Sequence, residues 1–334
     1  YWEVKVLFDG KVILITGATG SWGHELVRQL LKKKPEKIIV FSRNEASQVA
    51  MERKFNDGRL RFIIGDIREK ESIMRASESA DLIFHLAALK HVPVCEDQPL
   101  EALKTNVLGT QHVIEAAIDN HVEKVVYIST DKAANPANFY GLTKAMGEQL
   151  ITHANTLTNC TKFVTIRGGN VLGTSGSVIH VFKQQIETDG KVMITDKNMT
   201  RFFLTIEEAI QLLLKATECS IGGEIFVMKM PACRIMDLAE TLIEHSGKKE
   251  IEIVERGIRP GEKVHEILFS EYESQNTVIY DEDYYVILPT KNMSKLRKKY
   301  AGYPPVPKKS YSSDENVITK EEIRKLLKKG GFLP

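Results

Sequence analysis

The chain has 334 residues, of which 43% are hydrophobic and 27% charged, as expected for a globular protein with a sizeable core. Its formal net charge of +2 argues against general nucleic-acid binding, and no run of about 18 apolar residues predicts a membrane span. No secretory signal is visible, and the four cysteines form no C-x-x-C pair. We therefore expect buried free thiols, no metal site and a cytoplasmic location.

Short β-branched runs alternate with longer amphipathic segments over the first 170 residues. Each run is apolar on both faces and is followed by polar or glycine residues, which is typical of parallel strands buried on both sides. Strands are expected at residues 12–15, 37–41, 60–64, 82–84, 124–128 and 163–166, and helices at 25–33, 45–55, 69–76, 100–120 and 138–156. This alternation predicts an α/β fold with a Rossmann-type, doubly wound parallel sheet.

After Gly168 the alternation stops, and glycine-rich turns separate shorter elements. Helices are expected at 178–187, 206–217, 236–246 and 320–328, short strands at 192–194, 224–227 and 251–254, and a turn at 311–313. We predict a nucleotide-binding domain over residues 1–170, with segments exchanged after 170, and a smaller α/β substrate domain with a C-terminal tail over 171–334. The tail from residue 291 carries twelve Lys/Arg against four Asp/Glu, which favours a solvated basic surface or a contact with an anion.

A glycine-rich turn, Gly17-Ala-Thr-Gly20-Ser-Trp-Gly23, follows the first strand and leads directly into a helix. Glycine lets backbone N–H groups approach a pyrophosphate, whose charge the helix N-terminus favours. The spacing has one residue more than the general dinucleotide fingerprint, but its place after the first buried strand makes the signal strong. The candidate cofactor contacts in this turn are Gly17, Thr19, Gly20, Ser21, Trp22 and Gly23.

The second strand ends in Ser42 and Arg43, where NAD enzymes usually place an acid for the ribose 2′-hydroxyl. An Arg there suits a 2′-phosphate, so NADP is favoured over NAD. Asp66 ends the third strand and either accepts from the adenine amino group or caps a helix. Further cofactor candidates, at the ends of the third and fourth strands, are Ile67, Leu86, Ala87 and Ala88.

The fifth strand ends in Ser129-Thr130-Asp131-Lys132, at the edge of the sheet where ligands bind. Tyr140 and Lys144 follow at a helical i, i+4 spacing, which places them on one face of a helix. A nearby ammonium lowers the pKa of a phenol. Tyr140 could therefore take a hydroxyl proton while hydride leaves the same carbon for a nicotinamide.

Together these motifs resemble the extended short-chain dehydrogenase/reductase superfamily over roughly residues 10–330. The stretches 87–96, 129–136, 199–202 and 259–266 are similar to the inverting UDP-N-acetylglucosamine 4,6-dehydratases, lyases of pseudaminic acid and related surface-glycan synthesis. The resemblance implies UDP-N-acetylglucosamine as the substrate, bound by the second domain, and a homo-oligomer. It implies cofactor contacts from Lys90, Asn106, Ser129, Tyr140 and Lys144, and substrate contacts from Lys90, His91, Thr130, Asn170, Thr174, Ser177, Val178, Arg201, Arg259 and Glu262.

In the reaction that the resemblance implies, a hydride passes from the sugar to the cofactor and later returns to the sugar. Tyr140 takes the C4 hydroxyl proton while NADP⁺ accepts the C4 hydride. Lys132, as a neutral amine, then removes the C5 proton, and Asp131 protonates the departing C6 hydroxyl. Hydride returns to C6, and a proton returns to C5 from the opposite face. One water is lost, C5 is inverted and no cofactor is consumed.

The segment Arg167-Gly168-Gly169-Asn170 departs from the family pattern, which usually has Tyr at the second position. A missing aromatic could open space near the nicotinamide or sugar and leave the reaction at a 5,6-unsaturated UDP-sugar. Two other readings remain open. A UDP-sugar 4-epimerase would need Tyr140 and Lys144 without the Asp131–Lys132 pair, whereas a non-catalytic NADP-binding sensor would predict a damaged Tyr/Lys pair.

Overall fold

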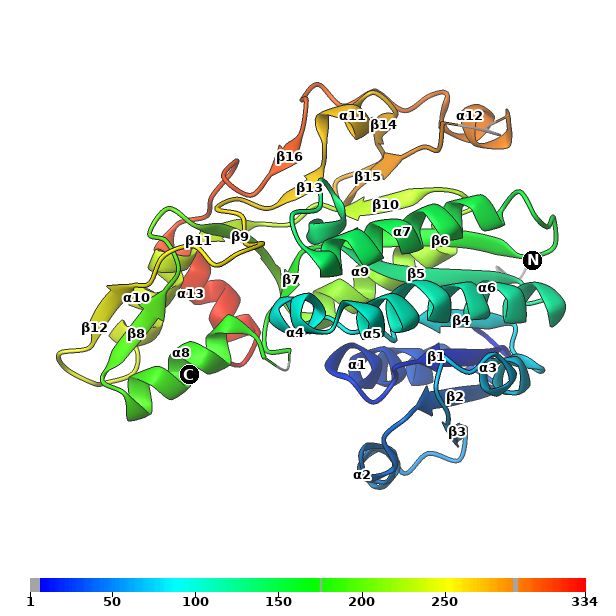
Figure 1. Cartoon of the computed structure of the whole chain (residues 1–334), viewed down its shortest axis with the longest axis horizontal. Helices are drawn as coiled ribbons and strands as arrows, with labels where there is room; N and C mark the ends of the chain where they lie inside the picture. Colours follow the sequence, from blue (N-terminus) through cyan, green and yellow to red (C-terminus); the bar gives the residue numbers. More distant parts are fainter. Residues whose placement is uncertain (1–6, 175, 291–293) are drawn as a thin grey trace, which may run out of the picture.

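The computed structural model describes residues 7–174, 176–290 and 294–334. Its largest element is a nine-stranded sheet in the order β14-β15-β10-β6-β5-β4-β1-β2-β3 (Figure 1). Strands β1 to β6 and β10 run parallel, and β15 and β14 continue the sheet in antiparallel fashion at one edge. The strands are β1 (Val12–Thr16), β2 (Lys37–Ser42), β3 (Leu60–Ile64), β4 (Leu82–His85), β5 (Lys124–Thr130), β6 (Lys162–Gly168), β10 (Ile225–Met228), β14 (Thr277–Ile279) and β15 (Tyr284–Ile287).

The strands and helices expected before Gly168 are present, which confirms the Rossmann-type α/β prediction. The helix expected at 100–120 is continuous but contains a π-helical segment, Lys104–Leu108, between α5 and α6. A short helix, α4, and the 3₁₀ turns Leu31–Lys33 and Asp131–Ala133 were not anticipated. The helices of this part are α1 (Ser21–Leu30), α2 (Glu45–Phe55), α3 (Lys70–Ser77), α4 (Val92–Asp97), α5 (Pro99–Leu103), α6 (Gly109–Asp119) and α7 (Phe139–Ala154).

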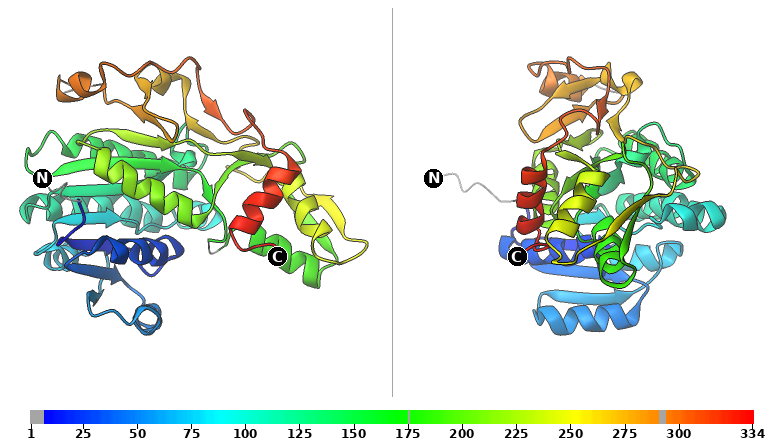
Figure 2. Two further views of the ribbon diagram at one scale, coloured as in Figure 1. Left: turned by 180° about the vertical axis from the view of Figure 1, so that it is seen from behind. Right: turned by 90° about the vertical axis from the view of Figure 1, so that its left-hand side faces the viewer.

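Helices cover both faces of the sheet. Along β1, Ile13 and Ile15 face the core that contains α1 and α9 (Ile206–Cys219), whereas Leu14 faces the core that contains α6 and α7. Figure 1 shows α3, α6 and α7 on the near face, and the reverse view in Figure 2 shows α9 across the far face. Burial on both sides explains why the strand runs are apolar throughout rather than alternating.

The strand order reverses between β1 and β4, since β2 and β3 lie on one side of this pair and β5 and β6 on the other. Ligands of such sheets bind outside the carboxyl ends of the strands at this switch point. The glycine-rich turn follows β1, Leu86–Ala88 follow β4, and Ser129 and Asp131 lie at the end of β5. The fold therefore brings the predicted cofactor and catalytic segments together at the carboxyl ends of the central strands.

The chain after residue 170 contributes to both parts of the molecule. Helix α9 and strands β10, β14 and β15 pack on or join the large sheet, and we keep the division near 170 as a proposal with these segments assigned to the first domain. Part of the chain after residue 170 forms a second lobe with its own core, at the left of Figure 1. Its elements are β7 (Asn170–Val171), α8 (Val178–Thr188), β8 (Lys191–Ile194), β9 (Thr200–Leu204), β11 (Ala232–Arg234), α10 (Ile235–Glu244), β12 (Glu252–Glu255) and α13 (Lys320–Lys329).

Several expectations for the second half were wrong. The predicted turn at 311–313 contains strand β16 (Tyr311–Ser312), which pairs with β13 (Ile267–Phe269) and buries Tyr311. Two short helices, α11 (Glu271–Ser274) and α12 (Ser294–Tyr300), were also missed. All four thiols are free, but Cys160 is exposed, so burial does not hold for every cysteine.

No helix in the described residues is long and apolar enough to span a membrane. No group of three or more His, Cys, Asp or Glu in the same ranges is placed to hold a metal ion.

Candidate active site

The glycine-rich turn between β1 and α1 is packed so closely that side chains are excluded. Gly17 has a φ of +68°, and a Cβ there would lie 2.8 Å from the backbone N of Ala87. A Cβ on Gly23 would lie 2.0 Å from the carbonyl oxygen of Ala18. Gly20 is the N-cap of α1 and supplies no side-chain cap. The turn therefore presents backbone at a helix N-terminus, the arrangement that suits a pyrophosphate.

The ends of β2 and β3 carry two guanidinium groups around one carboxylate. Arg68 donates from Nε and Nη2 to Asp66 Oδ2 at 2.8 and 2.6 Å, and Arg43 Nη1 lies 3.7 Å from the same oxygen. Burial opposes ionisation of Asp66, but the hydrogen bonds from Arg68 outweigh it and lower the pKa of the carboxyl. Asp66 also accepts from the Arg68 N–H, whereas the N-cap of α3 is Glu69, so the helix-cap alternative for Asp66 is wrong.

Asn106 fixes the loop that follows β4. Its Oδ1 accepts from the Leu89 N–H at 2.8 Å, and its Nδ2 donates to the Leu89 carbonyl and to Thr143 Oγ1. The side chain is 1% exposed and lies within the π-helical segment, a feature often found at functional sites. These bonds make Asn106 a positioning residue that ties the loop to α7.

A buried hydrogen-bond network lies beneath the glycine-rich turn and was not predicted from the sequence. His85, the last residue of β4, contacts Thr16 Oγ1 through Nδ1 at 2.7 Å and Thr110 Oγ1 through Nε2 at 3.0 Å. Burial lowers the pKa of His85 to about 3, so the imidazole is neutral. Thr16 also accepts from the Ala87 N–H, and the network therefore joins β1, β4 and α6.

Tyr140 and Lys144 both lie on α7, but the expected effect of Lys144 on Tyr140 is wrong. Lys144 Nζ donates to the Ile128 carbonyl at 2.6 Å and lies 3.9 Å from the ring centroid of Tyr127. Burial lowers the pKa of Lys144 to about 7. Burial also raises the pKa of Tyr140 to about 12, and the ammonium that opposes this rise belongs to Lys132.

Asp131, which is fully buried, and Lys132, which is partly exposed, form an ion pair. Lys132 Nζ donates to Asp131 Oδ1 at 3.0 Å, and Thr130 Oγ1 donates to the same oxygen. A second carboxylate, Glu266, places Oε1 3.6 Å from Lys132 Nζ. Burial opposes the charge on Lys132, but Asp131 and Glu266 outweigh it and raise the pKa of the ammonium. Lys132 is therefore charged at rest, and the reaction would require it as a neutral amine for only part of the cycle.

Unsatisfied polar atoms gather around this pair. Among the described residues, six buried side-chain oxygens have no hydrogen-bond partner, and three of them are Ser129 Oγ, Asp131 Oδ2 and Glu266 Oε2. Asp131 is fully buried and Glu266 is 2% exposed. Buried polar atoms are almost always paired in folded proteins, so this concentration marks a place where a polar ligand would fit.

The space beside Gly168 is already partly filled. A Cβ at residue 168 would lie 3.1 Å from Met228 Sδ, and the Gly169 N–H donates to Met230 Sδ at 2.9 Å. Methionine sulfur therefore occupies part of the space beside the backbone here, and the effect of the missing aromatic on the nicotinamide or sugar region stays a prediction. Gly169 itself borders the ion pair, since a Cβ there would lie 3.3 Å from Asp131 Oδ2.

The loop 259–266 lies against β9 and the start of α7. Arg201 is 8% exposed and donates from Nη1 to the carbonyls of Thr200 and Val264 and from Nη2 to that of Lys263. Arg201 therefore anchors this loop. Arg259 is exposed, with Nη1 4.0 Å from Glu262 Oε1.

The other residues predicted to bind cofactor or substrate lie in the segments described next. Lys90 and His91 are exposed before α4, and a Cβ on Gly176 would lie 2.9 Å from His91 Cε1. Thr174 Oγ1 donates to the Val171 carbonyl, and Ser177 is the N-cap of α8. Residue 175, within the predicted 173–178 loop, lies outside the described residues. Asn170 begins β7, Val178 begins α8, Ile67 packs on Gly109, and Ser42 Oγ accepts from Gln48 Nε2.

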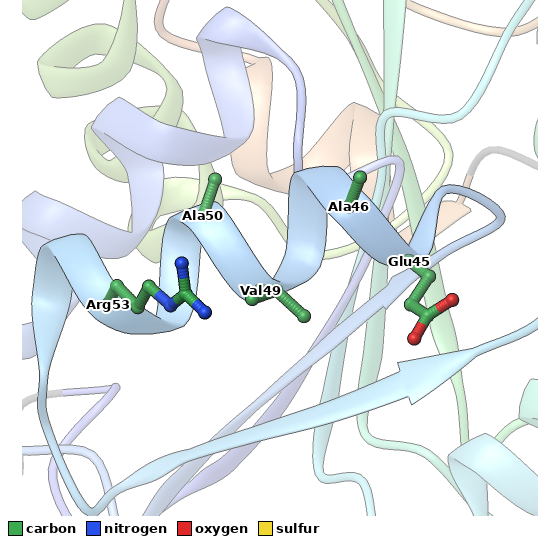
Figure 3. A pocket seen from close by; sticks show the side chains of 5 residues that line it. All are labelled: Glu45, Ala46, Val49, Ala50 and Arg53. Atoms are coloured by element: carbon green, nitrogen blue, oxygen red, sulfur yellow. The ribbon is translucent and has the colours of Figure 1, made fainter.

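A surface hollow on α2 is separate from these residues. It is lined by side chains of a single helix, as Figure 3 shows. None of the predicted catalytic, cofactor or substrate residues belongs to its lining, which consists of Glu45, Ala46, Val49, Ala50 and Arg53.

Known proteins resemble the chain over most of its length. A Methanocaldococcus jannaschii protein described only as an uncharacterized membrane protein is 43% identical over 339 residues, 99% of each chain. A Campylobacter jejuni UDP-N-acetylglucosamine 4,6-dehydratase (inverting) is 44% identical over 288 residues, 85% of this chain and 84% of that one. A Rickettsia felis protein named UDP-glucose 4-epimerase is 42% identical over 274 residues, 80% of each.

A solved structure is similar throughout. The X-ray structure of Pen from Bacillus thuringiensis superposes with a TM-score of 0.89 at 39% identity, and covers 96% of this chain and 99% of that chain. These relatives confirm the resemblance inferred from the motifs. Residues 13–288 match the model of the family described as polysaccharide biosynthesis protein, and the chain therefore belongs to that family.

Proposed function

We propose that this chain is an NADP-dependent, C5-inverting UDP-N-acetylglucosamine 4,6-dehydratase that acts in the cytoplasm in nucleotide-sugar synthesis for surface glycans. The observation that carries the proposal is the largely buried Asp131–Lys132 ion pair, whose Asp131 Oδ2 has no hydrogen-bond partner among the described residues. Elimination of water needs an acid and a base side by side, and a largely buried pair of this kind can supply both. The relative of that name supports the substrate.

The ion pair can become the required acid and base by moving one proton. Transfer from Lys132 Nζ to Asp131 Oδ1, across 3.0 Å, gives a neutral amine and a carboxylic acid without net proton uptake. The amine takes the C5 proton, and the C–H electron pair forms the C5–C6 double bond. The C6–O bond breaks, and its oxygen takes the Asp131 proton and leaves as water. The carboxylate and ammonium are then restored.

Tyr140 would hold the C4 hydroxyl and take its proton. Burial raises the pKa of Tyr140 to about 12, so the phenolate needs a nearby cation, and Lys132 is the cation that opposes this rise. The nicotinamide, when bound, would supply the hydride acceptor and donor for C4 and C6. Ser129 Oγ, buried and without a partner in the described structure, is a further group for a sugar hydroxyl.

NADP fits the residues at the sheet edge. The turn has no room for a Cβ at Gly17 or Gly23, so a pyrophosphate there would meet backbone N–H groups. Asp66 is an acceptor for the adenine amino group. Arg43, and Arg68 beside it, suit a 2′-phosphate, whereas an acid would suit the free hydroxyl of NAD.

Replacement of Arg43 by Ala should weaken NADP⁺ binding by about tenfold or more and leave NAD⁺ binding nearly unchanged, because only the 2′-phosphate needs the guanidinium. Calorimetric titration of cofactor-free protein with each cofactor measures both affinities. Arg53→Ala, on exposed α2, is the matched control. An equal loss for both cofactors, or none for NADP⁺, would contradict this assignment.

A second candidate, a UDP-sugar 4-epimerase, is favoured by the relative of that name. It would use Tyr140 and leave the Asp131–Lys132 pair without a task. The proposal is tested by incubating the protein with UDP-N-acetylglucosamine, without added cofactor, and measuring the molecular mass of the product by mass spectrometry. Loss of one water supports the dehydratase, whereas an isomer of unchanged mass would identify the epimerase and overturn it.

The homo-oligomer expected from the resemblance is supported by apolar side chains exposed on adjacent helices. Helix α7 contacts α4, α5 and the π-helical segment. Each of these elements exposes at least one large apolar side chain, and together they are Val94, Leu100, Leu108, Leu142 and Met146. Such a cluster is more often an interface than a solvated surface. We propose that a second copy of the chain covers it.

The double substitution Leu142→Glu, Met146→Lys should reduce the protein to a monomer, because it places charges in the proposed contact while forming a favourable i, i+4 pair. Light scattering of the eluting protein measures the mass. Leu157→Glu, at an exposed position after α7, should keep the wild-type mass. A double variant of unchanged mass would show that this face is not the interface.

A further inference from the structure

One buried carboxylate has no task in the steps proposed above. Glu266, 2% exposed, is clamped by Ser313: the Ser313 N–H donates to the Glu266 carbonyl at 2.8 Å, and Ser313 Oγ accepts from the Glu266 N–H at 2.9 Å. Its Oε1 lies 3.6 Å from Lys132 Nζ and 3.8 Å from Arg201 Nε. Its Oε2 is buried without a hydrogen-bond partner in the described ranges.

Lys132 lies between two negative groups that come from distant parts of the chain. Asp131 is its neighbour in sequence, whereas Glu266 precedes β13 and is held against the 3₁₀ turn by the fold. Arg201 adds a permanent positive charge near the same Glu266 oxygen, Oε1. The charged and titratable groups that face Lys132 from the elements packed around it are Asp131, Tyr140, Arg201, Lys263 and Glu266.

We propose that Glu266 is a positioning residue for the Asp131–Lys132 pair: its carboxylate holds the Lys132 ammonium beside Asp131 and toward the reacting sugar. The inference rests on the proposed dehydratase function. A carboxylate 3.6 Å from an ammonium, in a buried site, stabilises the charged form. The amine that Lys132 becomes is also a stronger base for the C5 proton.

Loss of the Glu266 charge should make the Lys132 ammonium easier to deprotonate, because the carboxylate 3.6 Å away no longer stabilises it. The proposed reaction starts from the protonated Lys132, so activity is lost at high pH when that proton is lost. Glu266→Gln should therefore shift the high-pH limb of the kcat–pH profile toward lower pH, by about one unit or more. It should lower kcat more than it changes KM.

The test compares dehydration rates over pH for the wild type, Glu266→Gln and Glu266→Asp, with Glu271→Gln as the control. Glu271 lies on exposed α11, where loss of its charge should leave the profile unchanged. Glu266→Asp keeps the charge at a greater distance and should shift the profile less than Glu266→Gln, in the same direction. If Glu266→Gln does not fold, as judged by thermal unfolding and cofactor binding, the Glu266→Asp profile decides alone.

A lower rate with the high-pH limb unmoved would reduce Glu266 to a structural role and overturn the inference. A shift toward higher pH would overturn it as well. Failure of the underlying function would look different, because the wild-type protein would then release no water from UDP-N-acetylglucosamine at any pH.

Discussion

Replacement of Asp131 by Asn should lower the rate of dehydration by about 10²–10⁴-fold, the range associated with loss of a general acid. The amide has nearly the shape of the carboxyl group but cannot deliver a proton to the C6 oxygen. Asp131 is fully buried, so no solvent acid stands beside it to take over. Rates of water loss from UDP-N-acetylglucosamine, followed by NMR, measure the effect.

The same variant should still oxidise C4, because that step needs Tyr140 and the cofactor but not Asp131. Reduced nicotinamide should therefore build up on the variant and be visible by its near-ultraviolet absorbance. Asp9→Asn, at an exposed position before β1, is the matched control. Dehydration by Asp131→Asn within about tenfold of the wild-type rate would remove Asp131 from the acid role.

Replacement of Arg167 by Met should lower the free energy of unfolding by about 3–5 kcal/mol, because it leaves the buried Glu148 and the partly buried Glu273 without their cation. Arg167 is 1% exposed. It donates to both carboxylate oxygens of Glu148 at 2.9 and 2.5 Å, to Glu273 Oε1 at 2.8 Å and to the Leu268 carbonyl. These bonds join β6 to α7, β13 and α11. Urea denaturation measures the change.

A second substitution separates loss of charge balance from loss of packing. Glu148→Gln placed on Arg167→Met removes one of the stranded charges, so the pair should be more stable than Arg167→Met alone. If Arg167→Met alone lowered the free energy of unfolding by less than about 1 kcal/mol, the network would be of little importance for stability, as exposed ion pairs usually are.

The parallel sheet could be predicted from sequence because its signals are local. The runs at 60–64 and the helix at 45–55 coincide with β3 and α2, since turn residues and caps such as Asn44 bound them. Strand β9, Thr200–Leu204, was missed although it is buried throughout, because Arg201 within it suggests a surface. Strands β7 and β16 contain two residues each and exist only through pairing with distant segments.

Some features of the candidate site could likewise be predicted from local sequence, and others could not. The positions of Asp131 and Tyr140 follow from where a strand ends and a helix begins. The approach of Glu266 to Lys132 depends on how the second lobe folds back, and no local pattern reports it. The pKa of Tyr140 was expected to fall and instead rises, because i, i+4 spacing does not reveal burial or that Lys144 turns to a backbone carbonyl.

The most direct test of the proposed function follows UDP-N-acetylglucosamine by NMR in heavy water, without added cofactor. The account predicts a 4-keto product with deuterium at C5 and a methyl group at C6 that keeps the substrate's own hydrogens, because the hydride taken from C4 returns there. An exocyclic methylene would place the end of the reaction at the 5,6-unsaturated sugar. A C4 epimer that retains its C6 hydroxyl, with no deuterium at C5, would contradict the account.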